Sequence, residues 1–163
     1  MYIDYNYYVG VYGQEIPETD FQRLSWEACR KLDLATTGVD GARKLKVSFP
    51  TDEGDAEAVR RCVCKLIDIM YQIQEAAKVA SQSKGYVETV NGLRGKVISS
   101  VSAGNESISY SVNNSGISTI IDKALADKTA REQLYKDTIT EYLSGVSDAN
   151  GVNLLYMGQY PYK

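Results

Sequence analysis

The feature that most constrains the fold is one long amphipathic segment, from Thr51 or Asp52 to about Ser81. Thr51 is a suitable helix cap, and acidic residues follow it, where they favour the positive end of a helix. Apolar residues then recur every three or four positions. The stripe is wide, which predicts that this helix is the central one. Its members are Ala56, Val59, Val63, Leu66, Ile69 or Met70, Ile73 and Ala77.

Three further helices are expected around this one. The first starts at Pro17, whose fixed backbone angle suits a first helical turn, and ends before Gly38. The other two lie near the C-terminus: one is capped by Ser118, and one runs from Asp127 to Gly145. The apolar face of the helix that starts at Pro17 consists of Phe21, Leu24, Ala28, Leu32 and Ala35.

Tyrosine is unusually frequent, with 13 tyrosines against 2 phenylalanines, and it gathers at both ends of the chain. Near the N-terminus, a cap at Asp4 and an end at Gly13 predict a short helix with Tyr8 and Tyr12 on one face. Tyrosine has an apolar ring and a polar tip, so it suits half-buried surfaces and interfaces. We therefore expect both chain ends to be adhesive surfaces. The clusters are Tyr2, Tyr5, Tyr7, Tyr8 and Tyr12, and Tyr156, Tyr160 and Tyr162.

Between about residues 96 and 112, apolar residues recur at every second position instead of at helical spacing. Valine, isoleucine and tyrosine alternate with serine on both sides of Ala103, Gly104 and Asn105. This pattern predicts a β-hairpin with those three residues at its tip. The preceding residues, 83–95, are expected to be a polar connector. An isolated hairpin is only marginally stable, so this one must pack on helices or on another subunit.

Together these segments predict a mainly α fold: a small helical bundle with one β-hairpin and an extended apolar C-terminal tail. Residues 1–145 form the bundle with its inserted hairpin, and residues 146–163 form the tail. Two courses of the tail stay open: it folds back on its own bundle, or it adds as a strand or plug to a neighbouring subunit. Its most apolar run is Leu154, Leu155, Tyr156 and Met157.

Several kinds of chemistry are excluded or unsupported. The chain has no histidine, which excludes Ser-His-Asp and Cys-His mechanisms and any histidine-ligated zinc. Cys29, Cys62 and Cys64 are too few to close a structural zinc site. On the long helix, Cys62 and Cys64 fall about 200° apart, so they neither chelate one ion together nor bridge each other. We interpret all three as free, small, buried residues in a reducing compartment.

Charge patterning adds little that is specific. The net charge is −3, so a fold-wide basic surface that grips DNA is not expected. Neither a membrane-spanning stretch nor a signal peptide is expected. The basic run at 43–46 is interpreted as a solvated loop, with a phosphate or partner contact as the alternative. The acidic run at 52–57 is interpreted as first-turn helix charge, with a metal cage as the alternative.

An ordered set of motifs along the chain resembles the head–tail connector (adaptor) proteins of long-tailed bacteriophages and prophages. The set covers most of the chain, in the order of that family. Residues 147–151 look like an insertion relative to the family. The motifs are Tyr7-Tyr8-x-x-x-Tyr12-Gly13-x-x-Ile16-Pro17-x-x-x-Phe21-x-x-Leu24-x-x-x-Ala28, then Val59-Arg60-Arg61-Cys62-Val63-Cys64-Lys65, the serine-rich hairpin, and Tyr142-Leu143-Ser144-Gly145 with Leu154-Leu155-Tyr156-Met157-Gly158.

The resemblance implies a non-enzymatic virion protein without cofactors, made in the host cytoplasm and located in the neck of the particle. Such proteins form a ring, on the order of a dozen copies, beneath the portal. The ring extends the channel through which double-stranded DNA passes without sequence-specific binding, and it joins the head to a stopper or tail-completion protein. We expect Leu154, Leu155, Tyr156 and Met157 to dock on the portal or an adjacent subunit. We also expect the hairpin tip, Ala103, Gly104 and Asn105, to become ordered in the ring.

Two alternatives to the connector hypothesis stay open. One is a small metal-binding or enzymatic domain that uses the Cys62/Cys64 pair or the acidic helix start. The other is a protein-interaction module that binds one partner and forms no ring. A further expectation concerns the tail: deletion of all residues after Gly151 leaves a folded bundle that no longer joins connector rings.

Overall fold

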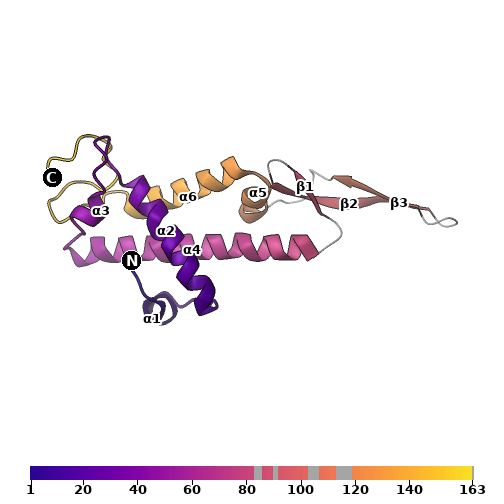
Figure 1. The fold of residues 1–163 in the computed structure, drawn as a ribbon, viewed down its shortest axis with the longest axis horizontal. Helices are drawn as coiled ribbons and strands as arrows, with labels where there is room; N and C mark the ends of the chain where they lie inside the picture. The colour runs from indigo at the N-terminus through magenta and orange to yellow at the C-terminus, as the bar shows by residue number, and fades with distance from the viewer. Residues whose placement is uncertain (83–85, 90–91, 103–106, 113–118, 163) are drawn as a thin grey trace. The chain divides into compact units, whose positions relative to one another are not determined.

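The computed structural model describes the backbone of residues 1–82, 86–89, 92–102, 107–112 and 119–162, and the side chains of residues 1–79 and 119–162. The chain is mainly helical, in agreement with the predicted fold class (Figure 1). Its residues group into two compact units, one formed by Met1–Tyr71 with Tyr135–Lys163 and the other by Gln72–Leu134. This division differs from the boundary at residues 145 and 146 that the sequence suggests, and each unit is described separately.

The first unit is built from helices whose bounds follow the sequence pattern closely. In chain order they are α1 (Tyr5–Tyr7), the π-helical turn η1 (Tyr8–Tyr12), α2 (Glu18–Ala35), α3 (Lys44–Val47), most of α4 (Glu53–Gln82) and the end of α6 (Lys128–Leu143). Its core combines the apolar stripes of α2, α4 and α6. The best-buried of these side chains, none more than 4% exposed, are Phe21, Leu24, Ala28, Leu32, Val59, Val63, Leu66, Ile67, Ile139 and Leu143.

The helix ends show the local signals expected of them. Asp4 caps α1 by accepting a 2.7 Å hydrogen bond from the amide of Tyr7. Gly13 ends η1 with a φ of 83°, in the left-handed region that glycine tolerates best. At the start of α4 the cap is Asp52, which accepts a 3.0 Å hydrogen bond from the Asp55 amide. The expectation that Thr51 is this cap is therefore corrected by one residue.

The N-terminal tyrosines pack onto their own unit rather than projecting as an adhesive end. Tyr8 is fully buried, and its ring lies 5.4 Å from that of Phe21. The hydroxyl of Tyr8 donates a 3.0 Å hydrogen bond to the carboxylate of Asp68 on α4, and the Tyr12 hydroxyl donates a 3.4 Å bond to its other oxygen. As predicted, Tyr8 and Tyr12 share one side of their turn, with ring centroids 5.7 Å apart.

The second unit contains the rest of α4, a small sheet, α5 (Ile120–Ala126) and the start of α6. The sheet has the order β1-β2-β3, with β1 (Tyr86–Thr89), β2 (Gly92–Ser102) and β3 (Ser107–Val112), and both neighbouring pairs are antiparallel. Residues 83–95, expected to be a polar connector, instead hold β1 and the start of β2. Thr119 caps α5 through a reciprocal capping box with Asp122, which corrects the expected cap at Ser118.

The two serine-rich runs lie on β2 and β3, which pair from Lys96↔Val112 to Ser102↔Ser107 with one irregularity between Ile98 and Ser100. The predicted tip, Ala103, Gly104 and Asn105, lies outside the described residues, so the complete hairpin stays a prediction. None of the helices within the described part of the chain combines the length and apolarity needed to cross a bilayer.

Candidate functional site

Two loops of similar geometry lie at the C-terminal ends of α2 and α6. In the first, Gly38 donates a 3.1 Å hydrogen bond to the carbonyl of Ala42, and Thr37 pairs with Arg43 as an isolated bridge. In the second, Asp148 donates a 2.9 Å bond to the carbonyl of Val152. We call them loop 1 (residues 37–43) and loop 2 (residues 147–153). Each therefore returns the chain in a tight turn immediately after a helix.

A glycine with positive φ closes each turn. Gly41 in loop 1 and Gly151 in loop 2 both have a φ of 77°, which a side chain disfavours. An aspartate precedes each of these glycines. Asp40 accepts a 3.2 Å hydrogen bond from the Ala42 amide, and Asp148 accepts 2.9 Å bonds from two amides of its own loop. These side-chain bonds stabilise both turns.

The chain after loop 2 is held against the first unit by Lys44. The side chain of Lys44 is fully buried, and its ammonium donates to the carbonyl oxygens of Asn153, at 3.3 Å, Leu154, at 2.8 Å, and Tyr156. Burial lowers the pKa of Lys44, while Asp148 and Asp40 act in the opposite direction. The C-terminal segment accordingly lies beside α3 (Figure 1). Lys44 thus contradicts the interpretation of residues 43–46 as a solvated loop.

A second contact holds the end of the segment. Tyr160 is 1% exposed, and its hydroxyl donates to the buried carboxylate of Asp148. The amide of Asn150 donates 3.0 Å hydrogen bonds to the hydroxyls of Tyr160 and Ser48. Burial, together with the bond to Asp148, raises the pKa of Tyr160. The prediction of an extended apolar tail is therefore not confirmed, because these contacts fold residues 153–160 back onto the first unit.

The four residues expected to dock on a partner separate into two classes. Leu154 is completely buried and Leu155 is half-buried, so both serve the first unit. Tyr156 and Met157 are 52% and 56% exposed. Only this second pair is accessible to a partner in the folded chain.

Val39, at the tip of loop 1, completes an apolar surface with these two residues. It is 76% exposed, and its amide donates a 3.3 Å hydrogen bond to the carbonyl of Met157. We call Val39, Tyr156 and Met157 the docking patch. Val39 was not among the residues predicted from the sequence, because a single valine in a loop is common on protein surfaces and carries no signal of a contact by itself.

Loop 1 and the C-terminal segment approach each other closely at two glycines. A Cβ on Gly38 would lie 2.9 Å from the carbonyl oxygen of Gly158, and a Cβ on Gly158 would overlap the Tyr156 ring. Glycine at these positions therefore brings Val39 next to Met157 and determines where the Tyr156 ring lies.

The cysteines and the acidic helix start show no arrangement for metal binding. Cys29, Cys62 and Cys64 are free and buried, and burial raises the pKa of both Cys62 and Cys64 to about 12. Within the described residues, no three histidine, cysteine or acidic side chains lie close enough to hold one ion. In the acidic run, Asp52 caps α4 and the Asp55 carboxylate accepts a 2.9 Å hydrogen bond from the Ser147 amide.

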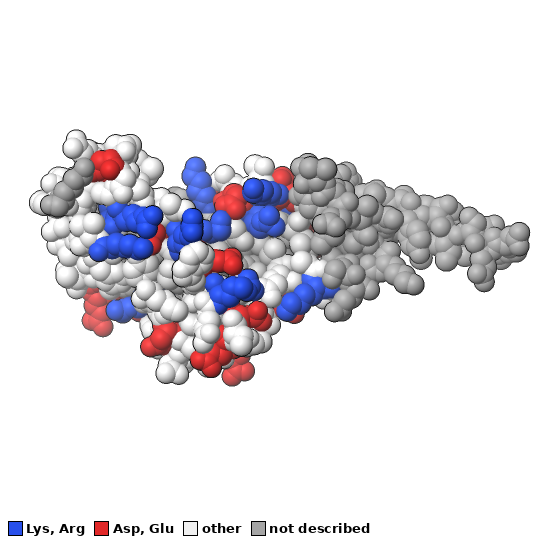
Figure 2. Space-filling view, viewed as in Figure 1, with Lys and Arg blue, Asp and Glu red and all other residues white. Residues whose placement is uncertain are grey.

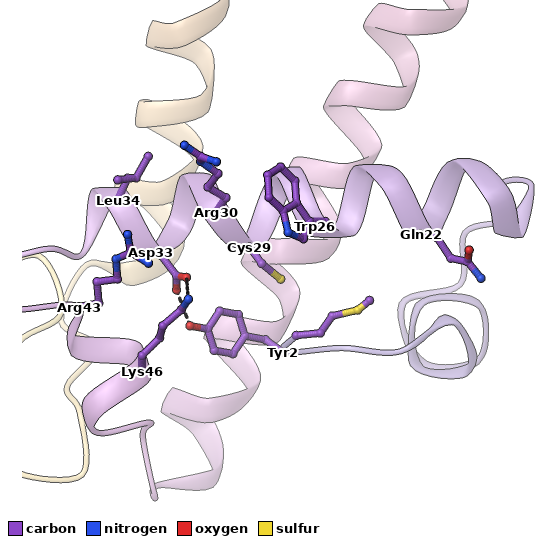
Figure 3. Close-up of a pocket in the computed structure, with 10 residues that line it drawn as sticks. Tyr2, Gln22, Trp26, Cys29, Arg30, Asp33, Leu34, Arg43 and Lys46 are labelled. Atoms are coloured by element: carbon purple, nitrogen blue, oxygen red, sulfur yellow. Dashed lines mark hydrogen bonds and ion pairs between the residues drawn. The ribbon is translucent and has the colours of Figure 1, made fainter.

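A separate cavity of about 590 Å³ lies between α2, α3 and the N-terminal segment (Figure 3). Asp33, only 6% exposed, accepts a hydrogen bond from the hydroxyl of Tyr2 and lies 3.3 Å from the ammonium of Lys46. Burial and the hydrogen bond to Asp33 raise the pKa of Tyr2. The other lining residues are Met1, Gln22, Trp26, Cys29, Arg30, Leu34 and Arg43.

No family model, curated protein or solved structure matches the chain.

Proposed function

We propose that this protein is a structural head–tail connector, or adaptor, of a long-tailed bacteriophage or prophage. In this proposal, copies form a ring beneath the portal, extend the DNA channel and join the head to a stopper or tail-completion protein. The role requires neither catalysis nor a cofactor, and it places the protein in the virion neck after assembly in the host cytoplasm. The ordered motif set supports the family, and the docking patch is the observation that carries the proposed contact with the portal.

The docking patch has the properties of a protein-binding surface. Its three side chains are apolar and each is more than half exposed, whereas the segment that carries two of them is anchored by the buried ammonium of Lys44. An anchored backbone loses little conformational entropy on binding, so exposed side chains on it are effective contacts. Large apolar side chains such as Tyr156 and Met157 also contribute strongly to interfaces when a partner covers them.

The overall charge is compatible with a channel component. A ring that lets DNA slide must not bind phosphates tightly, and the affinity of proteins for DNA rises with the number of basic contacts. The chain carries 21 acidic and 18 basic residues, so strong non-specific retention of DNA is not expected.

The test is binding of the full-length chain to isolated portal rings, followed by electron microscopy of the complex. Met157→Asp and Val39→Asp place a charge in the docking patch and are expected to weaken portal binding at least tenfold. Val79→Asp is the matched control, because Val79 is 63% exposed on α4 and lies outside the patch. Loss of binding in all three variants, or in none of them, contradicts the assignment of the patch.

The microscopy separates the connector role from a simple interaction module. Density for a closed ring of this chain against the portal supports the connector proposal. A single copy bound to one partner without a ring supports the module instead, and absence of portal binding by the unmodified chain overturns the proposed function.

A further inference from the structure

The cavity beside α2 has an exposed rim that combines an aromatic residue with basic residues. Trp26, the only tryptophan of the chain, is 61% exposed, and Leu34 is 55% exposed. The guanidinium of Arg30 lies 5.4 Å from the centre of the Trp26 ring. These three residues follow one another at four-residue spacing, so they form one ridge along α2 (Figure 3).

The rim carries more positive charge than its own acidic residue neutralises. Among the residues lining the cavity, Lys46 pairs with Asp33, whereas no carboxylate partner is found within the described residues for Arg30 or Arg43. Tryptophan and arginine are the residues most enriched in the energetic centres of interfaces. We call Trp26, Arg30, Leu34 and Arg43 the basic socket. Its chemistry fits an acidic protein segment with an apolar contact.

The same unit carries a complementary surface at the other end of α2. Glu15 and Glu18 are exposed, and in the described structure neither carboxylate has a basic partner. Val11, on the adjacent turn η1, is 53% exposed. We call Val11, Glu15 and Glu18 the acidic edge. In Figure 2 acidic side chains gather at the lower edge of the molecule, where Figure 1 draws α1 and the start of α2.

The socket and the edge cannot meet within one molecule. Glu18 and Arg30 are twelve residues apart on one continuous helix, a separation of about 18 Å along its axis, which their side chains do not span. The two surfaces are different and complementary, which is what a head-to-tail contact between identical subunits requires. We propose that the basic socket of one copy binds the acidic edge of the next copy.

This inference rests on the proposed association of copies, and it assigns the residues that mediate it. The test compares two charge reversals in the full-length chain: Arg30→Glu with Arg43→Glu in the socket, and Glu15→Lys with Glu18→Lys on the edge. Self-association is measured by sedimentation velocity up to millimolar protein at low salt. Each reversal alone is expected to weaken association at least tenfold. An equal mixture of the two variants restores it, because each then offers a surface complementary to the other.

The control carries the same change in net charge as the socket reversal, at sites elsewhere: Lys123→Glu with Lys136→Glu, both exposed on α5 and α6, is expected to associate like the unmodified chain. Circular dichroism verifies that every variant is folded. The inference is overturned if the unmodified chain does not associate, if the single reversals associate normally, or if the mixture is no better than either variant alone. Portal binding is measured separately, because the basic socket and the docking patch share no residue. A chain that binds the portal but does not use the socket overturns this inference alone, whereas loss of portal binding by the unmodified chain overturns the proposed function.

Discussion

The hydroxyl of Tyr8 donates a 3.0 Å hydrogen bond to Oδ1 of Asp68, a residue 60 positions later in the sequence. Both side chains are buried, and the bond ties the N-terminal turn to the central helix. The second oxygen of Asp68 accepts from Tyr12 at the longer distance of 3.4 Å. Desolvation and the nearby Asp68 raise the pKa values of both tyrosines.

Removal of the Tyr8 hydroxyl is expected to destabilise the fold. Tyr8→Phe keeps the ring but leaves a buried carboxylate oxygen without its donor, which costs about 1–3 kcal/mol. Tyr12→Phe is the matched control and is expected to cost less than about 1 kcal/mol, since Tyr12 is half-buried and its bond is long. Urea denaturation gives both values. Equal losses in the two variants would contradict the stronger role assigned to the bond between Tyr8 and Asp68.

Lys44→Met is expected to release the C-terminal segment. Methionine fills a similar volume but donates no hydrogen bond, so three backbone carbonyls lose their donor, at a cost of about 1–3 kcal/mol. Hydrogen exchange at the Leu154 amide, which donates to the carbonyl of Val146 at 2.9 Å, should then accelerate. Lys46→Met is the control: Lys46 is exposed and pairs with the buried Asp33 rather than with the C-terminal segment, so exchange at the Leu154 amide should stay unchanged. Unchanged exchange in Lys44→Met would contradict the anchoring role.

Alkaline pH is expected to destabilise the chain in part through its buried thiols. Burial raises the pKa of Cys62 from 9.0 to about 12 in the folded state. Between these pH values the unfolded chain loses a proton that the folded chain keeps, so the free energy of unfolding falls as pH rises. Cys62→Ala removes this contribution, and denaturation at several pH values should give a shallower decline between pH 9 and 12. An identical slope in the variant would disprove the assignment.

Gly158→Ala tests the geometry of the docking patch without removing one of its side chains. The added methyl group overlaps the ring of Tyr156, which is exposed and can rotate away. We expect a small change in thermal stability and a loss of portal affinity of about tenfold, corresponding to 1.4 kcal/mol. Gly10→Ala is the comparison variant, since a Cβ there has no neighbouring atom within 4 Å. Portal affinity that is equal in the two variants would exclude Tyr156 from the contact.

The helices were largely predictable because their signals are local. Residues with helical spacing and a capping side chain mark α2, α4 and α6 to within a few positions. Cap identity was harder, since adjacent Thr51 and Asp52, and likewise Ser118 and Thr119, satisfy the same rule. Strand β1 was missed because Tyr86–Thr89 alternates too briefly to be distinguished from a connector, and its pairing with β2 is what defines it.

The candidate site depended on contacts that local patterns do not contain. Lys44 lies in a basic run typical of solvated loops, yet its acceptors are 109 or more positions away. The sequence left the course of the C-terminal segment open, and the structure places Leu154 in the interior and Tyr156 and Met157 on the surface. Deletion of all residues after Gly151 therefore removes the buried Leu154 and Tyr160 as well, so we now expect it to impair folding in addition to any effect on assembly.

The anchoring of the C-terminal segment has an evolutionary consequence. Lys44 holds this segment mainly through backbone carbonyls, which every amino acid provides, and its ammonium also lies 5.7 Å from the centre of the Tyr156 ring. Tyr156 contributes its ring to this contact, but the path of the chain is largely uncoupled from the identity of the outward-facing side chain at position 157. Mutations there are free to follow changes in a binding partner while the scaffold beneath them is preserved.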